Sequence, residues 1–197
     1  MFRKTLIATV TVAGIISTAS VFAAPIASND FGGGTMLLHG KVTDAPCTIA
    51  AENADMDVDL GQVSLTHMKA TNSTGEMRPI VIKLGDCAFE AGTDGHDKDF
   101  GILSKADVTF SGFTSPTPTK GIVPNDAQLG KATGVDIQLL RNASTPFNLT
   151  PGTEAVGTQL VPGNDNQLTL YAQMITTGAS PTHGAVSAHI NYKLNYF

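Results

Sequence analysis

Two acidic stretches contain the side chains best suited to binding a metal ion. In DMDVDLG, Asp55, Asp57 and Asp59 alternate with apolar residues, as at the start of a calcium-binding loop. An EF-hand loop beginning at Asp55 requires Gly at its sixth position and Glu at its twelfth. The sequence has Leu60 and Thr66 there. The stretch is therefore better interpreted as a strand whose acidic side chains face water.

The second acidic stretch, DGHDKD at residues 94–99, could hold a cation weakly through its aspartates and His96. A solvated loop tip explains these residues equally well, because their spacing matches no known type of metal site. We expect no metal and no cofactor.

Catalytic motifs are also missing from the sequence. The five histidines form no HxH or HExxH group, and there is no GxSxG or Walker motif. The glycines of residues 32–34 are not followed by the helix that a phosphate-binding loop requires. Since no activated nucleophile or paired carboxylate is identifiable, we predict that the protein is not an enzyme.

The beginning of the sequence predicts export. Arg3 and Lys4 precede an apolar run over residues 6–16, and the segment ends in the small residue Ala23. The apolar run is too short to span a bilayer, so residues 1–23 are interpreted as a cleaved signal peptide. The remainder has the size of one domain.

The charge and the cysteines of the exported chain restrict its function further. The full chain has a net charge of −5, and it has no cluster of Lys and Arg, which makes nucleic acid an improbable partner. For Cys47 and Cys87 a disulfide is the default in an oxidising compartment. A metal pair or a reactive thiol is the alternative, but neither a CxxC spacing nor a neighbouring His supports it.

The rest of the chain reads as short strands separated by turns. Apolar and polar residues alternate in several segments, with Gly, Pro and Asn between them. A short helix is conceivable only at residues 61–70. This pattern predicts an immunoglobulin-like β-sandwich. The predicted strands are residues 42–49, 54–63, 78–87, 106–113, 133–141, 166–175 and 188–196.

The last predicted strand has no later strand to pair with it. Residues 188–196 alternate without a fault, and Ile190, Tyr192, Leu194 and Tyr196 lie on its apolar face. An unpaired edge exposes backbone N–H and C=O groups and favours pairing with another chain.

Several segments, in this order, resemble the pilins of the chaperone–usher pathway, which are the subunits of type 1 and P-type fimbriae of Gram-negative bacteria. FGGGTMLLHGKV leads into DAPCTI, DLGQVS, an alternating strand ending in DC, DVTFSG, and a final strand with penultimate Tyr196. The resemblance covers essentially the whole exported chain. Two features depart from it: the terminal Phe197, where many relatives have a polar residue, and the three consecutive glycines.

The resemblance implies an all-β fold, an incomplete immunoglobulin-like β-sandwich that lacks its last strand and is completed in trans by a donor strand. It also implies partners: a periplasmic chaperone, an outer-membrane usher and neighbouring fimbrial subunits. The protein would pass through the periplasm to extracellular surface fimbriae. The groove edge facing the chaperone would consist of Ile190, Tyr192, Leu194, Tyr196 and Phe197.

Residues 32–40 have the form of a donor strand for a neighbouring subunit. The alternative is an ordinary first strand, but its glycines would weaken it, and another predicted strand follows at residues 42–49. The predicted organisation is a signal peptide at 1–23, a donor extension at 24–40 and a pilin domain at 41–197. The donor residues that would enter the groove are Gly32, Gly34, Met36, Leu38 and Gly40.

The sequence thus predicts a structural subunit of an adhesive surface fimbria that polymerises by donor-strand exchange. The competing hypothesis is a monomeric secreted β-sandwich that binds a carbohydrate. Such a protein would need clustered aromatic side chains, and this chain has three Tyr and no Trp.

Overall fold

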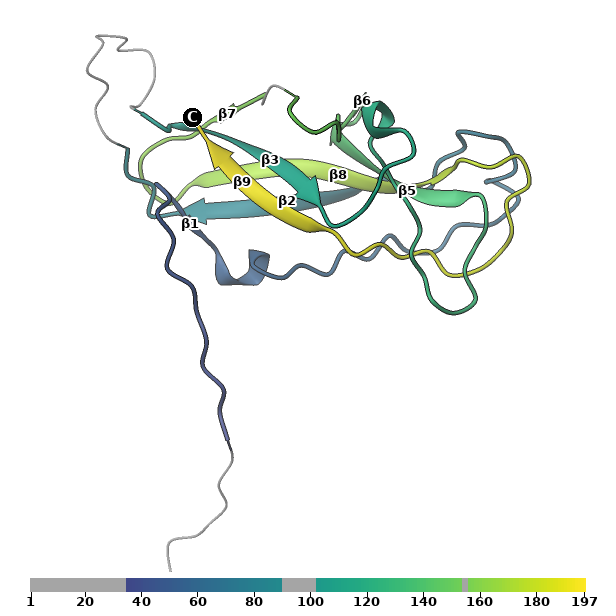
Figure 1. Ribbon diagram of the computed structural model, residues 1–197, viewed down its shortest axis with the longest axis horizontal. Helices are drawn as coiled ribbons and strands as arrows, with labels where there is room; N and C mark the ends of the chain where they lie inside the picture. The colour runs from purple at the N-terminus through teal and green to yellow at the C-terminus, as the bar shows by residue number, and fades with distance from the viewer. Residues whose placement is uncertain (1–34, 90–101, 154–155) are drawn as a thin grey trace, which may run out of the picture. The chain divides into compact units, whose positions relative to one another are not determined.

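The computed structural model describes residues 35–89, 102–153 and 156–197. The predicted signal peptide, Gly32, Gly34 and the DGHDKD stretch lie outside the described residues. Residues 43–197 form one compact unit, and the chain before them is separate from it. The described part of the compact unit consists of antiparallel strands with two single-turn 3-10 helices, η1 (Ala51–Asn53) and η2 (Pro118–Lys120) (Figure 1).

The larger of two sheets contains the longest strands. Its order is β1-β2-β8-β5-β4, with β6 paired to β5. The central strand β8 pairs with β2 from Arg78↔Ala172 to Leu84↔Asn166, and with β5 from Val135↔Thr176 to Leu140↔Tyr171. The bounds are β1 (Thr48–Ile49), β2 (Arg78–Gly85), β4 (Ile122–Val123), β5 (Val135–Asn142), β6 (Thr145–Pro146) and β8 (Asn166–Thr176).

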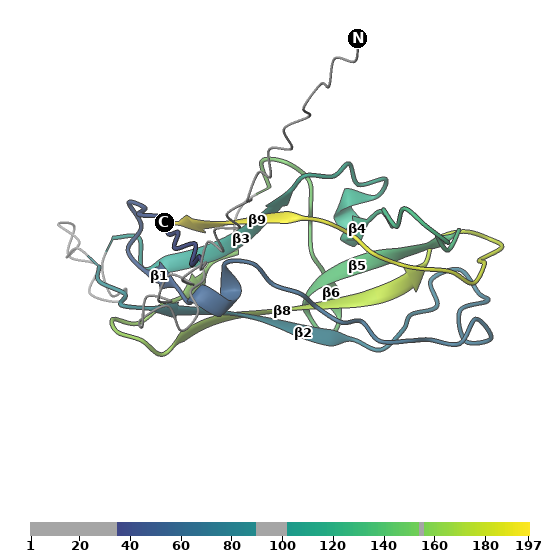
Figure 2. The same ribbon diagram turned by 90° about the horizontal axis from the view of Figure 1, so that it is seen from below.

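The smaller sheet has the order β7-β3-β9, so β9 is an edge strand. Its strands are β3 (Lys105–Ser111), β7 (Thr158–Gln159) and β9 (Asn191–Tyr196). Figure 2 shows β3 and β9 in one layer and β2, β5 and β8 in the other. Alternate side chains of both layers form the core, as expected where two sheets pack face to face. The predicted β-sandwich is confirmed.

Alternation in the sequence correctly identified the core side of the long strands. Ile82 and Leu84 of β2 are buried, as are Leu168 and Leu170 of β8. Strand β5 is buried at every residue from Ile137 to Leu140, which a simple alternation does not predict.

Three predicted elements differ from the structure. The strand expected at residues 42–49 is reduced to β1, because Pro46 before it has no N–H to donate to a ladder. Residues 61–70 form a turn and no helix, with His67 N–H bonded to Ser64 O. Residues 54–63 alternate in burial as expected, yet they form no strand, because no other described segment pairs with them.

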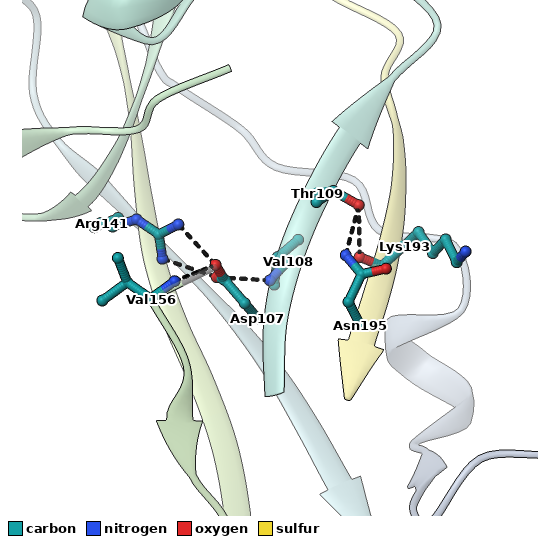
Figure 3. Close-up of polar contacts among 7 residues, drawn as sticks. All are labelled: Asp107, Val108, Thr109, Arg141, Val156, Lys193 and Asn195. Atoms are coloured by element: carbon teal, nitrogen blue, oxygen red, sulfur yellow. Dashed lines mark hydrogen bonds and ion pairs between the residues drawn. The ribbon is translucent and has the colours of Figure 1, made fainter. Parts of the chain in front are cut away.

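Two links tie separate parts of the sandwich together. Cys47 and Cys87 form a disulfide across 40 residues, as the sequence predicted. Asp107 on β3 receives two hydrogen bonds, 2.8 and 2.9 Å long, from the guanidinium of Arg141 on β5. It also accepts the N–H of Val156 at 2.9 Å (Figure 3). This ion pair, in which Asp107 is buried and Arg141 is partly buried, joins the two sheets.

Candidate functional site: an open groove along the sandwich

An open groove of about 1480 Å³ runs along the compact unit. Its floor is the inner face of the larger sheet, where side chains of β2, β4, β5 and β8 meet. These side chains are apolar and belong to the buried core, each being at most 9% exposed. The floor residues are Ile80, Val123, Val135, Ile137, Leu139, Ala172 and Met174.

Residues 56–63 form the first wall. Met56, Val58 and Leu60 are half-buried and line the groove, while the aspartates between them are exposed. Within the described chain, the only backbone group of residues 55–63 in a hydrogen bond is the N–H of Gly61, which Asp59 Oδ1 accepts at 2.8 Å. The wall is therefore extended chain with an unpaired backbone.

Residues 182–191 form the second wall and lead into β9. Val186, Ala188 and Ile190 are half-buried and pack against the core. Among the residues that the structure describes, no group bonds to the backbone N–H or C=O of these three. The coils that lead away from η1 and into β9 in Figure 2 are the two walls.

The opposite edge of the second wall is hydrogen-bonded, in the manner of a strand with a neighbour. Asp126 N–H donates to Ser187 O at 2.8 Å. Asn125 Oδ1 accepts Ser187 N–H at 3.1 Å, and Asp126 Oδ2 accepts His189 N–H at 2.9 Å. Because backbone groups point alternately to the two sides of an extended chain, residues 187 and 189 face this loop. Residues 186, 188 and 190 then face the groove.

The loop that makes these bonds is itself fixed. Asn125 is 2% exposed, and its Nδ2 donates to Ala132 O at 3.1 Å and to Ala185 O at 3.0 Å. Its backbone N–H donates to Asp136 Oδ1 on β5 at 2.9 Å. Asn125 thereby connects the larger sheet to the second wall.

Asp126 is the charged group of this loop. Its Oδ1 accepts Ser187 Oγ–H at 2.9 Å, and its Oδ2 accepts His189 Nδ1–H at 2.8 Å. Desolvation opposes the charge of the carboxylate, but the hydrogen bonds from His189 and Ser187 outweigh it. Together they hold the pKa of Asp126 below its ordinary value.

The residues predicted to face a chaperone lie in β9 and directly beside its two ends. Ile190 lines the groove and Leu194 is buried. Tyr192 donates its hydroxyl to Asn53 O. The hydroxyl of Tyr196 is buried and has no hydrogen-bond partner among the described residues, and burial raises the pKa of Tyr196.

Phe197 continues the pairing of β9 with β3. Its N–H donates to Lys105 O at 3.0 Å, and its carbonyl accepts Lys105 N–H at 3.1 Å. A Cβ at Gly157 would collide with the ring of Phe197, so the ring lies against that glycine. The other edge of β9, away from β3, is unpaired in the described structure.

The predicted donor residues within the described chain are exposed. Met36 and Leu38 are 79% and 81% exposed, and a Cβ added at Gly40 would meet no described atom within 4 Å. Two neighbouring apolar residues, Leu37 and Val42, are exposed as well. The described part of the predicted donor strand therefore exposes its large apolar side chains.

Other kinds of site find no support in the described residues. No three Asp, Glu, His or Cys side chains are grouped to hold a metal ion there. The same part of the chain contains no helix long and apolar enough to cross a membrane.

The arrangement of the groove suits one kind of ligand. Two extended walls with free backbone groups flank an apolar floor, so an extended peptide could pair with either wall while alternate side chains point to the floor. Of the residues that the sequence predicted to face a chaperone, Ile190 lines this groove. The sequence had not identified residues 56–60 as a wall, nor Asn125 and Asp126 as its support.

Comparison with known proteins gives the class. The sequence model of a family described as fimbrial protein matches residues 36–196. The fimbrial subunit ElfA of Escherichia coli K12 is 32% identical over 198 residues, which cover 100% of both chains.

Solved structures agree with this match. A chain from a chaperone–usher pilus whose structure concerns rod uncoiling superposes with a TM-score of 0.66 and 27% identity, covering 85% of this chain and 97% of that one. The P pilus rod subunit PapA gives a TM-score of 0.60 and 27% identity, covering 78% and 100%.

The chain therefore belongs to the fimbrial protein family. It is a structural subunit of an extracellular surface fimbria, as the sequence predicted.

Proposed function

We propose that the subunit polymerises by accepting, in its groove, an extended segment from another copy, and by giving its own residues 32–40 to the next. The observation that carries this proposal is the groove of about 1480 Å³ with an apolar floor and two walls, each with an unpaired backbone edge. Before assembly a periplasmic chaperone would fill the groove, and an outer-membrane usher would then bring the subunits together.

The exposed segment before the compact unit supplies a suitable occupant. Met36 and Leu38 share one parity and are almost fully exposed. Burying each of them on the floor would contribute roughly 1.5–3 kcal/mol. Each new backbone hydrogen bond to a wall would add about 1 kcal/mol in net terms.

The chaperone would bind beside β9, whose outer edge is free. The half-buried tyrosines of that strand and the 45% exposure of Phe197 support this assignment of Tyr192, Tyr196 and Phe197. Deleting residues 192–197 should abolish co-purification with the chaperone, and an intact complex would show that it grips another edge.

The role proposed for the subunit is mechanical and not enzymatic. The groove floor is apolar, and at its rim the hydroxyl of Ser187 and the imidazole of His189 each bond to the carboxylate of Asp126, where they hold the second wall. The alternative, a monomeric carbohydrate-binding sandwich, would leave unexplained an apolar groove between two walls that each have an unpaired backbone edge.

A truncated subunit tests the proposal. A subunit without residues 24–40 keeps its groove but has no strand to give, so it should end a fibre when mixed with intact subunits. Electron microscopy should show fibres that shorten as the truncated fraction rises. Fibres of normal length built from truncated subunits alone would refute the mechanism.

A pair of glycine variants tests the strand register. Gly34→Leu places a large side chain toward the floor, at a cost of roughly 1–3 kcal/mol, whereas Gly33→Leu turns its side chain away. Only Gly34→Leu should shorten the fibres. Equal lengths for the two variants would rule out this register.

A further inference from the structure

We infer that Asn125 and Asp126 are positioning residues for strand capture: they hold the second wall of the groove extended, so that it can pair with an incoming strand. This inference rests on the proposed function. We call these two residues the wall clamp.

The wall clamp does for the second wall what a neighbouring strand does in a complete sheet. Strand β9 is paired with β3 only from Asn191 onward, so residues 186–190 have no strand on either side in the described structure. On one side of the wall, the clamp forms hydrogen bonds to the backbone of residues 185, 187 and 189. On the other side, no described group forms a hydrogen bond to the backbone of residues 186, 188 and 190.

A wall held along one edge stays competent to bind along its free edge. Without the clamp, residues 186–190 would have many conformations, and an incoming strand would pair only with the extended fraction. Apparent affinity and capture rate fall in proportion to the competent fraction. Once a donor strand is bound, it fixes the wall itself, so the clamp should matter less for release.

This predicted asymmetry separates a positioning role from a merely structural one. A residue that only stabilises the fold changes the unfolding temperature, but it leaves capture by the folded subunit unchanged. A positioning residue slows association of the donor and has little effect on its dissociation.

Asp126→Ala is the informative variant. Asn125 is almost fully buried with several bonds, so Asn125→Ala could prevent folding. Asp126 is a partly exposed residue whose side chain, within the described part of the chain, hydrogen-bonds to Ser187 and His189 alone. Asp165→Ala is the matched control, because Asp165 is exposed, does not line the groove and has no side-chain hydrogen bond in the described structure.

The probe is a fluorescent peptide with the sequence of residues 32–42, mixed with the mature subunit and followed by stopped-flow anisotropy. We expect Asp126→Ala to lower the association rate constant about three- to tenfold, with the dissociation rate constant changed less than twofold. Asp126→Asn, which keeps an oxygen acceptor, should recover part of the rate. Asp165→Ala should match the wild type.

Amide hydrogen exchange gives a second readout. In the wild-type subunit without peptide, the N–H groups of Ser187 and His189 should exchange slowly and those of Val186, Ala188 and Ile190 quickly. The peptide should slow the latter three. In Asp126→Ala, His189 should lose its protection.

Two failures have different meanings. If the wild-type subunit does not bind the peptide, the proposed function is wrong. If it binds, but Asp126→Ala binds at the wild-type rate with His189 still protected, the wall clamp alone is refuted.

Discussion

Leu37 and Leu38 offer a sharp test of strand parity, because they are adjacent, identical in type and equally exposed in the subunit, at 82% and 81%. In the fibre, Leu38 should lie on the groove floor and Leu37 should face outward. Truncating each to Ala therefore compares one side chain in two environments. Neither change should alter the free energy of unfolding of the isolated subunit by more than about 0.5 kcal/mol.

The expected difference follows from burial. Leu→Ala at a well-packed buried position costs about 2–4 kcal/mol, which weakens binding about thirtyfold to several hundredfold. An outward-facing Leu→Ala should cost about 0.5 kcal/mol or less. Leu38→Ala should therefore weaken binding at least ten times more than Leu37→Ala.

Competition binding measures this difference directly. Unlabelled peptides of residues 32–42 carrying either change would displace the labelled wild-type peptide from the mature subunit. Equal losses for the two peptides would refute insertion with alternate side chains buried. A larger loss for Leu37→Ala would mean that the opposite face of the segment enters the groove.

Three further predictions concern the disulfide, the ion pair of Asp107 with Arg141, and the pH dependence that Asp126 gives to peptide capture. Changing both Cys47 and Cys87 to Ser should cost about 4 kcal/mol of stability and leave little subunit in the periplasm; a normal yield would contradict this. Asp107→Ala leaves the guanidinium of Arg141 unpaired and should cost about 3–5 kcal/mol in denaturant unfolding, whereas a loss below 1 kcal/mol would show that the ion pair is dispensable. Because the pKa of Asp126 is lowered in the folded state, its stabilisation is present at neutral pH. It is lost as the pH falls through that lowered pKa, so peptide capture should slow in strong acid in the wild type and not in Asp126→Ala.

Sequence patterns located the sandwich well where burial imposes a strict alternation. Ile80, Ile82 and Leu84 occupy one parity of β2, and all three are buried. The predicted disulfide also formed, because two cysteines in an exported chain have only each other as partners.

The groove walls were harder to predict, because alternation reports which side chains face the core and not what the backbone pairs with. Met56, Val58 and Leu60 have the pattern of an ordinary strand, but no described strand lies beside them. The same ambiguity made residues 188–190 part of the last strand in the sequence, although β9 begins at Asn191.

The polar residues that support the groove wall and join the sheets follow no recognisable sequence pattern. Asn125 and Asp126 lie in VPNDAQLG, a stretch with ordinary turn composition. Their bonds to Ser187 and His189 span about sixty residues. Asp107 was equally hidden, since its partner Arg141 lies 34 residues away on the opposite sheet. Such contacts depend on the tertiary fold, which local patterns do not specify.

Cross-linking in mixed fibres tests the central claim most directly. Fibres would be assembled from equal amounts of isotopically light and heavy subunits that carry photo-leucine at residue 38, and the linked peptides would be identified by mass spectrometry. Strand donation between copies predicts links from residue 38 to residues 56–63 or 186–190, with light–heavy pairs as frequent as random mixing gives. Links confined to light–light and heavy–heavy pairs would mean that each chain fills its own groove and would contradict the account.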